Sequence, residues 1–165
     1  MNNRCSVAAL LIPLILTAMT AHGAAPLQPG DGFPDFAARD QHGVDYRFET
    51  GTQAVLIAFD MASAKLANEV LAGEDAEFLP DHRAVYISNI YGMPAIGRYF
   101  AFSKLRKYPH RIVLADGEHL LDAFPRNEGH VTVIRLDDRG VVQTIRFWNP
   151  QVDSLQDFLE GTPAE

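Results

Sequence analysis

The chain has 165 residues, of which 47% are hydrophobic and 21% charged, and its formal net charge is −7. This size and composition indicate one globular domain, and an acidic chain without a nucleic-acid-binding motif argues against a nucleic-acid partner. The single cysteine is Cys5. Internal disulfides, thiolate catalysis and cysteine metal ligation are therefore excluded for the rest of the chain.

An export signal is predicted at the start of the chain. The basic start Met1–Arg4 precedes an apolar run over residues 7–16, and Ala21 and Gly23 form a small-x-small cleavage pattern. The run is shorter than the roughly 20 residues that span a bilayer, so we expect no stable membrane anchor after cleavage. Removing residues 1–23 leaves 142 residues with a formal charge of −8 and no cysteine. We expect a periplasmic or secreted protein; retention as a membrane anchor is the alternative.

The predicted elements of the remaining chain alternate between strands and helices. An extended stretch (24–34) and a turn (40–43) come first, and alternation over 44–48 predicts an edge strand. Apolar runs predict buried strands over 53–59 and 83–90, and helical spacing predicts helices over 62–72 and 95–108. A short strand (111–114), a hairpin (131–136 and 141–147) and a helix that Asn149-Pro150 opens and Gly161 ends complete the chain.

The first predicted helix has Ala62, Leu66 and Val70 at four-residue spacing, with Asp60 or Ser63 as its N-cap. Strand-helix-strand units that lead into a closing hairpin and helix predict a three-layer α/β sandwich with a mixed central sheet. We expect this sandwich to be a single domain over residues 24–165.

Several segments of the chain resemble known families. Residues 27–43 (LQPGDGFPDFAARDQHG) resemble the opening of peroxiredoxins and TlpA-type thioredoxin-fold proteins. The segments SAKLANEVL, SNIYGMPAIGRYFAFSKLRKYP and VTVIRLDDRGVV resemble the YtfJ-type family of small periplasmic proteins, which lack the redox cysteine pair. The resemblance implies a thioredoxin-like fold and an exported protein, and it leaves the biochemical activity open.

Two departures from the wider superfamily bear on the activity. Its reactive cysteine would follow the first buried strand, where this chain reads Asp60-Met61-Ala62-Ser63-Ala64-Lys65. Its cis-proline would lie at about Val131, which here follows His130. A cis bond without proline costs about 2.5–4 kcal/mol, so we expect the His130–Val131 bond to be trans. The loss of both features implies the loss of thiol chemistry.

The junction after the first buried strand has three interpretations. Ser63 as nucleophile with Lys65 as base would make a hydrolase, although no Gly-x-Ser-x-Gly elbow is present. Alternatively, the helix N-terminus binds a carboxylate or phosphate through Ser63, Ala64 and Lys65. Asp60 would oppose such an anion or occupy its place as the helix cap, in which case Lys65 is a solvated charge. His130 is a further candidate, because it lies where the superfamily has its substrate loop.

A basic, aromatic segment lies in the middle of the chain. Residues 82–115 contain no Asp or Glu and six cations, four of which are binding candidates: Arg98, Lys104, Arg106 and Lys107. Five aromatic residues are interleaved with them: Tyr91, Tyr99, Phe100, Phe102 and Tyr108. Such a helix can present its charges to an anionic partner. In the alternative, its aromatic residues pack inward and its cations balance acids elsewhere on the fold.

No metal site or cofactor is expected, because the five histidines beyond residue 23 form no HExxH or HxH pattern. The leading hypothesis is an exported, non-catalytic binding or accessory module whose partner is a protein or small anionic ligand of the cell envelope. One alternative is a thiol-independent hydrolase that uses Ser63. Another is a redox-family protein that works through the thiols of a partner.

Overall fold

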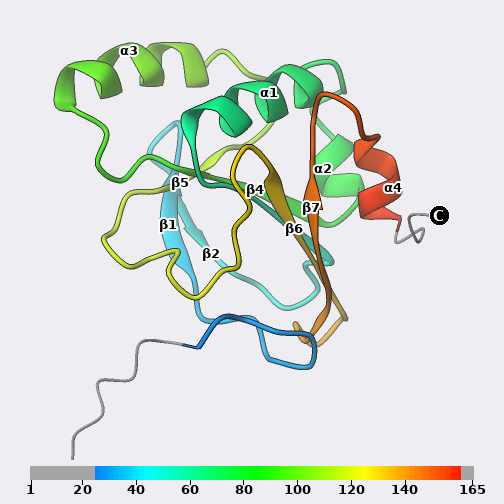
Figure 1. Cartoon of the computed structure of the whole chain (residues 1–165). Coiled ribbons are helices and arrows are strands. Elements are labelled where there is room, and N and C mark those ends of the chain that lie inside the picture. Colours follow the sequence, from blue (N-terminus) through cyan, green and yellow to red (C-terminus); the bar gives the residue numbers. More distant parts are fainter. Residues whose placement is uncertain (1–24, 161–165) are drawn as a thin grey trace, which may run out of the picture.

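Seven strands form one mixed sheet in the computed structural model, which describes residues 25–160 (Figure 1). The strands are β1 (Ala37–Asp40), β2 (Asp45–Arg47), β3 (Ala54–Ala58), β4 (Ala84–Asn89), β5 (Val113–Ala115), β6 (Val131–Leu136) and β7 (Val142–Trp148). Their order is β2-β1-β5-β4-β3-β6-β7. The neighbours β3, β4 and β5 are parallel, and all other pairs are antiparallel. The predicted export signal and the predicted helix end at Gly161 lie outside the described residues.

The helices are α1 (Met61–Leu71), α2 (Phe78–Asp81), α3 (Ala95–Leu105) and α4 (Leu155–Leu159). α1 connects β3 to β4, and α3 connects β4 to β5. These strands follow one another in a single direction across the sheet, so right-handed crossovers place α1 and α3 on the same face (Figure 1). Within residues 25–160, no helix has the length and apolar character needed to cross a membrane.

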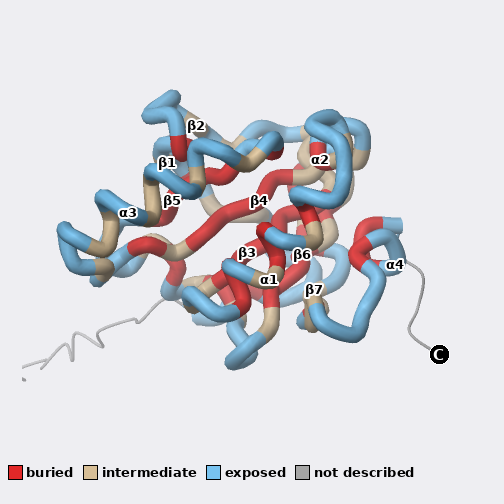
Figure 2. Tube along the Cα trace, turned by 90° about the horizontal axis from the view of Figure 1, so that it is seen from above, coloured by how far each residue is buried: buried red, intermediate tan, exposed pale blue. Residues whose placement is uncertain are grey.

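The two faces of the sheet are covered differently. On one face, Leu56 and Tyr86 pack with Leu71 of α1 and Phe158 of α4 in a single hydrophobic cluster. On the other face, the cluster consists of strand residues and apolar residues of irregular segments, among them Phe36 and Phe124. The predicted three-layer sandwich therefore consists of a helical layer, the sheet, and a third layer of irregular chain. β3 lies inside the sheet between β4 and β6, and all of its residues are buried (Figure 2).

Three elements differ from the prediction. Strand β1 and the short helix α2 were not expected, and the last helix begins at Leu155 instead of Pro150. Asp153 explains the late start, because its carboxylate accepts from the Asn149 N–H at 3.0 Å and its carbonyl accepts from Trp148 Nε1 at 3.1 Å. These bonds hold residues 149–153 as a turn. Trp148 is fully buried in the hydrophobic cluster that also contains Leu155, Phe158 and Leu159 of α4.

The buried face of α1 also differs from the predicted one. Its buried residues are Ser63, Ala64, Ala67, Asn68 and Leu71, whereas Ala62 is exposed and Leu66 and Val70 are half-buried. The small side chains on this face let the helix approach the sheet closely. The same face also carries two polar residues, Ser63 and Asn68, which lie buried against the sheet. The four-residue spacing predicted the helix correctly, but it assigned the inward face one position away from the true one.

Candidate functional site

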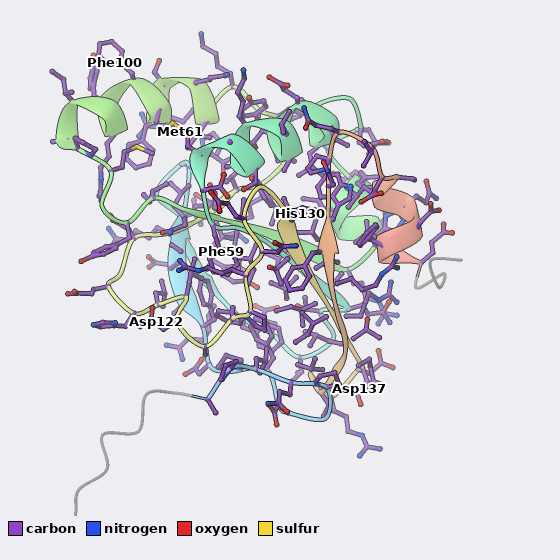
Figure 3. All side chains as sticks on the ribbon, viewed as in Figure 1. Phe59, Met61, Phe100, Asp122, His130 and Asp137 are labelled. Carbon is purple, nitrogen blue, oxygen red and sulfur yellow. The ribbon has the colours of Figure 1, made fainter. Side chains whose placement is uncertain are left out.

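The ends of three strands meet at one edge of the sheet. Ala58 of β3 lies beside Ser88 of β4 and beside Val131 of β6, so the segments that follow β3 and β4 and precede β6 are neighbours. The side chain of Asn89 donates to the Phe59 carbonyl at 3.2 Å and ties two of these segments together. Figure 3 labels Phe59, Met61 and His130 around this edge. Open α/β sheets commonly bind ligands where parallel strands end, so this edge is a candidate site.

Asp60 occupies the N-terminus of α1. Its backbone is extended (φ −128°, ψ 163°), and its Oδ1 accepts from the backbone N–H of Ser63 at 2.8 Å. Partial burial of the carboxyl opposes its ionisation, but hydrogen bonds from Ser63 and from the N–H groups of Gly129 and Ala62 hold its pKa below the usual value. Asp60 is therefore the predicted N-cap, and it also bridges α1 to the segment before β6. An external anion at this helix end would have to displace it.

Ser63 and Lys65 do not form a catalytic pair. Ser63 is 0% exposed, and its hydroxyl lies 3.1 Å from the Asp60 carbonyl, to which it donates. Lys65 is exposed and lies 3.9 Å from Glu69 on the next turn of the helix. Ala64 is buried, and its carbonyl accepts from Asn68 on the same helix. This geometry argues against the Ser63 hydrolase, because a substrate has no access to the hydroxyl.

His130 is half-buried at the start of β6, and its Nδ1 lies 2.9 Å from the Glu128 carbonyl. The His130–Val131 bond is trans, as expected, and residues 25–160 contain no cis peptide bond. A role for His130 in binding stays a prediction.

A buried polar pair beneath α1 was not predicted from the sequence. His110 Nε2 lies 2.9 Å from Asn68 Oδ1, and the Asn68 amide donates to the Ala64 carbonyl at 2.7 Å. Because the NH₂ group of Asn68 donates to the Ala64 carbonyl, the atom that faces the histidine is Oδ1, which accepts from the Nε2–H of His110. Burial lowers the pKa of His110 to about 4, so this histidine is neutral at physiological pH. The pair stabilises the packing of α1 on the sheet and has no access to a ligand.

Arg98 is half-buried and paired within the fold, as expected in the alternative in which the cations of this segment balance acids elsewhere. Both ends of its guanidinium pair with the carboxylate of Asp116, and Nε donates to the Met93 carbonyl at 3.1 Å. A further bond reaches the Ile90 carbonyl at 3.3 Å. Arg98 therefore fastens the start of α3 to the end of β5. Arg111 is engaged in the same way, since its Nε lies 3.0 Å from the carboxylate of Asp40.

Three cations at the end of α3 remain exposed to solvent: Lys104, Arg106 and Lys107. Lys104 and Lys107 make no side-chain hydrogen bond or ion pair within residues 25–160. Arg106 donates from Nε to the Gln41 carbonyl at 3.1 Å, which leaves its charge without a carboxylate. Of the four basic binding candidates, these three therefore form an uncompensated positive cluster.

The aromatic residues of the same segment divide into two groups. Phe102 and Tyr108 pack partly buried against the helical-face cluster, as the inward-packing alternative predicts. That alternative is wrong for Tyr99 and Phe100, which are 75% and 69% exposed, and Ile96 beside them is 76% exposed. The Tyr99 and Phe100 rings contact each other edge to face, with centroids 5.6 Å apart. No residue of α3 is buried.

The exposed apolar residues and Lys104 share one side of α3. Positions 96, 99, 100 and 104 recur at helical spacings of three and four residues, on the side away from the partly buried Phe102 and Leu105, and Arg106 and Lys107 follow directly at the C-terminal end of the helix. Figure 3 shows Phe100 pointing away from the sheet. We call this surface the outer face of α3; it consists of Ile96, Tyr99, Phe100, Lys104, Arg106 and Lys107. A helical projection of the sequence would have found two apolar sides on this helix, a signal that the search for charge runs did not use.

Within the described residues, no group of three or more His, Cys, Asp or Glu side chains is placed to hold a metal ion. His119 pairs with Asp122 at 2.6 Å on the exposed surface, which raises the pKa of the histidine through that hydrogen bond and the carboxylate charge. The lone cysteine, Cys5, lies outside the described residues.

Comparison with solved structures identifies the fold. The chain is similar to peroxidoxin BcpB from Mycobacterium tuberculosis, with 15% identity, a TM-score of 0.55, and coverage of 84% of this chain and 99% of the other. It is also similar to the thioredoxin domain of a thiol-disulfide oxidoreductase from Bacteroides vulgatus (15%, TM-score 0.53, 81% and 99%). A third similar structure is a putative thiol:disulfide interchange protein DsbE from Chlorobium tepidum (16%, TM-score 0.53, 82% and 97%).

The fold is thus thioredoxin-like, with a mixed sheet, as predicted. Identities of this size show the fold alone and transfer no activity. Comparisons with protein-family models and with curated proteins find no match. The YtfJ-type resemblance therefore stays a prediction that rests on the three quoted segments.

Proposed function

We propose that this chain is an exported, non-catalytic binding module that uses the outer face of α3 as its contact surface. The observation that carries the proposal is the composition of this face. Three large apolar side chains are about three-quarters exposed beside three cations that no carboxylate neutralises. Single exposed apolar residues are ordinary on protein surfaces, but a contiguous group with a charged border is typical of an interaction site.

The other candidate site supports contact less well than the outer face does. At the edge formed by β3, β4 and β6, Asp60 already occupies the helix N-terminus and Ser63 is buried behind it. Beyond Cys5 the chain has no thiol for the thiol-disulfide chemistry after which a structural neighbour is named. A protein that has neither a reactive thiol nor an accessible serine at this edge, and that exposes apolar and basic side chains on α3, is better suited to binding than to catalysis.

The proposal is tested by retention on an envelope extract. The exported protein, purified from the periplasm of an expressing strain, is immobilised and compared with a K104Q/R106Q/K107Q variant. The matched control is R47Q/R126Q/R139Q, which removes three exposed cations elsewhere and changes the net charge equally. We expect the α3 variant to retain much less envelope material than the wild type, with the difference shrinking at high salt, while the control variant retains as much as the wild type. Equal retention by all three proteins would overturn the proposal.

A redox function through a partner's thiols is the second candidate, and the names of the structural neighbours favour it. The neighbours include a peroxidoxin, a thiol-disulfide oxidoreductase and a thiol:disulfide interchange protein. Reduction of insulin disulfides or of peroxide by the purified protein, measured with and without added envelope extract, tests this function. Turnover would support the redox candidate against the binding module.

A further inference from the structure

We propose that the outer face of α3 binds peripherally to an anionic lipid surface. This inference rests on the proposed function and names the partner of its contact surface. It follows from the position of α3 in the fold, from the separation of charge along the chain, and from the shape of the exposed apolar group.

α3 lies at the periphery of the molecule, where its outer side is open to solvent (Figures 1 and 2). It is held to the rest of the fold by Phe102 and Leu105, which pack on the helical-face cluster, and by the Arg98–Asp116 pair. Ordinary surface helices turn their polar residues outward, whereas this helix turns Ile96, Tyr99 and Phe100 outward. Water is therefore an unfavourable environment for the outer face, and a partner that covers it would stabilise it.

The charges around the outer face select an anionic partner. Residues 82–115 contain no acid, and three of their cations pair with carboxylates from other parts of the fold: Arg83 with Asp138, Arg98 with Asp116 and Arg111 with Asp40. The cluster of Lys104, Arg106 and Lys107 thus stands at the surface of an otherwise acidic chain. An anionic surface would attract this side of the molecule and repel the remainder, which orients α3 toward it.

A second copy of the chain is a poor occupant of the same face. Two outer faces packed together would bring two clusters of three cations close to one another without an acid from either α3 segment. Like charges at an interface are unfavourable, so contact between two outer faces would be repulsive. Charge complementarity therefore favours a different partner over self-association.

The shape of the face distinguishes a lipid surface from an acidic protein. Protein hot spots are well-packed pockets at the centre of an interface. Neither Ile96 nor Phe100 lines the cavity of about 670 Å³ between β1 and α3, or the smaller hollow of about 340 Å³ beside the helix that is lined by Tyr99, Phe102, Ser103 and Arg106. Ile96 and Phe100 project outward, as the apolar residues of interfacial helices do when they enter the boundary between headgroups and acyl chains. Tyr99 suits the same depth, because tyrosine is enriched at membrane interfaces.

Vesicle flotation with the purified exported protein tests the inference. The probes are phosphatidylcholine vesicles with and without phosphatidylglycerol, at low and high salt. We expect the protein to float only with the vesicles that contain phosphatidylglycerol and to be released by salt. Each removed cation should weaken binding about fivefold, so K104Q/R106Q/K107Q should bind about a hundredfold more weakly. R47Q/R126Q/R139Q should bind like the wild type, and I96S/F100S should bind weakly although its charge is unchanged.

A fluorescence measurement tests the insertion of the face itself. Tyr99→Trp places an indole on the outer face, while the native Trp148 is buried and contributes a constant background. We expect a blue shift on addition of phosphatidylglycerol vesicles and quenching by brominated lipid. Failure of the wild type to bind these vesicles, or equal binding by the α3 and control variants, would overturn the lipid inference. If the α3-dependent retention on envelope extract persists in that case, the binding module stands and an acidic polypeptide is its partner.

Discussion

Asn68 and His110 meet beneath α1, where Asn68 Oδ1 accepts from His110 Nε2 at 2.9 Å. One residue comes from a helix and the other from the loop before β5, and both are almost completely buried. Nothing in the spacing of either residue indicates this contact. It joins the helical layer to the part of the chain that follows α3, and it makes the stability of the fold dependent on pH.

We expect the free energy of unfolding to decrease as the pH falls below the usual histidine range. Burial lowers the pKa of His110 from 6.5 to about 4 in the folded protein, so the unfolded chain binds a proton first. The stability that neutral His110 contributes is complete above pH 6.5, declines between pH 6.5 and 4, and is lost below pH 4. From about pH 7.5 to about pH 5 the loss is about 2 kcal/mol. Urea denaturation of the wild type and of H110Q at both pH values measures this loss. If the free energy of unfolding fell equally in the two proteins, the prediction would be contradicted.

Replacement of Asp60 by alanine should destabilise the protein by about 1 kcal/mol, because it removes the N-cap of α1. Asp60→Asn keeps the capping oxygen and should cost less. Because the pKa of Asp60 is lowered from 3.8, its ionised form contributes stability above that pH and loses the contribution as the pH falls through the folded pKa. Denaturant titrations of the three proteins check the order wild type, D60N, D60A. A D60A protein as stable as the wild type at neutral pH would show that the cap is dispensable.

Arg98 and Lys104 should respond differently to substitution, although both are cations of α3. Arg98→Ala removes the pairing with Asp116 and the side-chain hydrogen bonds to the carbonyls of Met93 and Ile90, and we expect a loss of about 2 kcal/mol. Lys104→Ala touches no partner and should change stability by less than about 0.5 kcal/mol. Thermal unfolding of the wild type and of both variants measures the two losses of stability. Similar losses in the two variants would mean that the ion pair with Asp116 is not important for the fold.

Cysteine substitutions test the burial of Ser63. The Met61 side chain is 69% exposed at the first position of α1, whereas Ser63 is 0% exposed two residues later. A thiol at position 63 would react only through local opening of the helix. Met61→Cys should therefore react with Ellman's reagent on the order of a hundredfold faster than Ser63→Cys. The unsubstituted protein supplies the background rate, and comparable rates for the two variants would place Ser63 at an accessible surface.

The central part of the fold was predictable because burial leaves a strong pattern in the sequence. β3, β4 and β6 are apolar runs of the kind that both layers cover, and the turn at 137–140 joins the closing hairpin as expected. β1 was missed because its four residues, two alanines followed by Arg39 and Asp40, have little of the alternation or the β-branched and aromatic content that marks a strand. The late start of α4 was missed because the turn before it depends on Asp153, whose two hydrogen bonds are not visible in a capping pattern.

The candidate sites were predictable only in part. The charge run of residues 82–115 made α3 a candidate, which stays a prediction, and Asp60 was correctly named as a possible cap. The sequence does not show which cations of this segment form ion pairs. Arg98 and Lys104 both lie on α3, and only Arg98 has a carboxylate next to it, because Asp116 follows directly after β5. The outward direction of Tyr99 and Phe100 likewise depends on which side of α3 faces the sheet, and a helix with two apolar sides does not reveal that.

The carboxylate at the start of α1 has a consequence for engineering. Three backbone donors, from Ala62, Ser63 and Gly129, converge on the single side chain of Asp60. The fold thus forms a cradle of N–H groups suited to a negative charge, and the carboxylate of Asp60 occupies that cradle. Truncation of that one side chain to glycine would leave these three N–H groups without their acceptor, which makes position 60 the natural starting point for designing a receptor for small oxyanions on this framework.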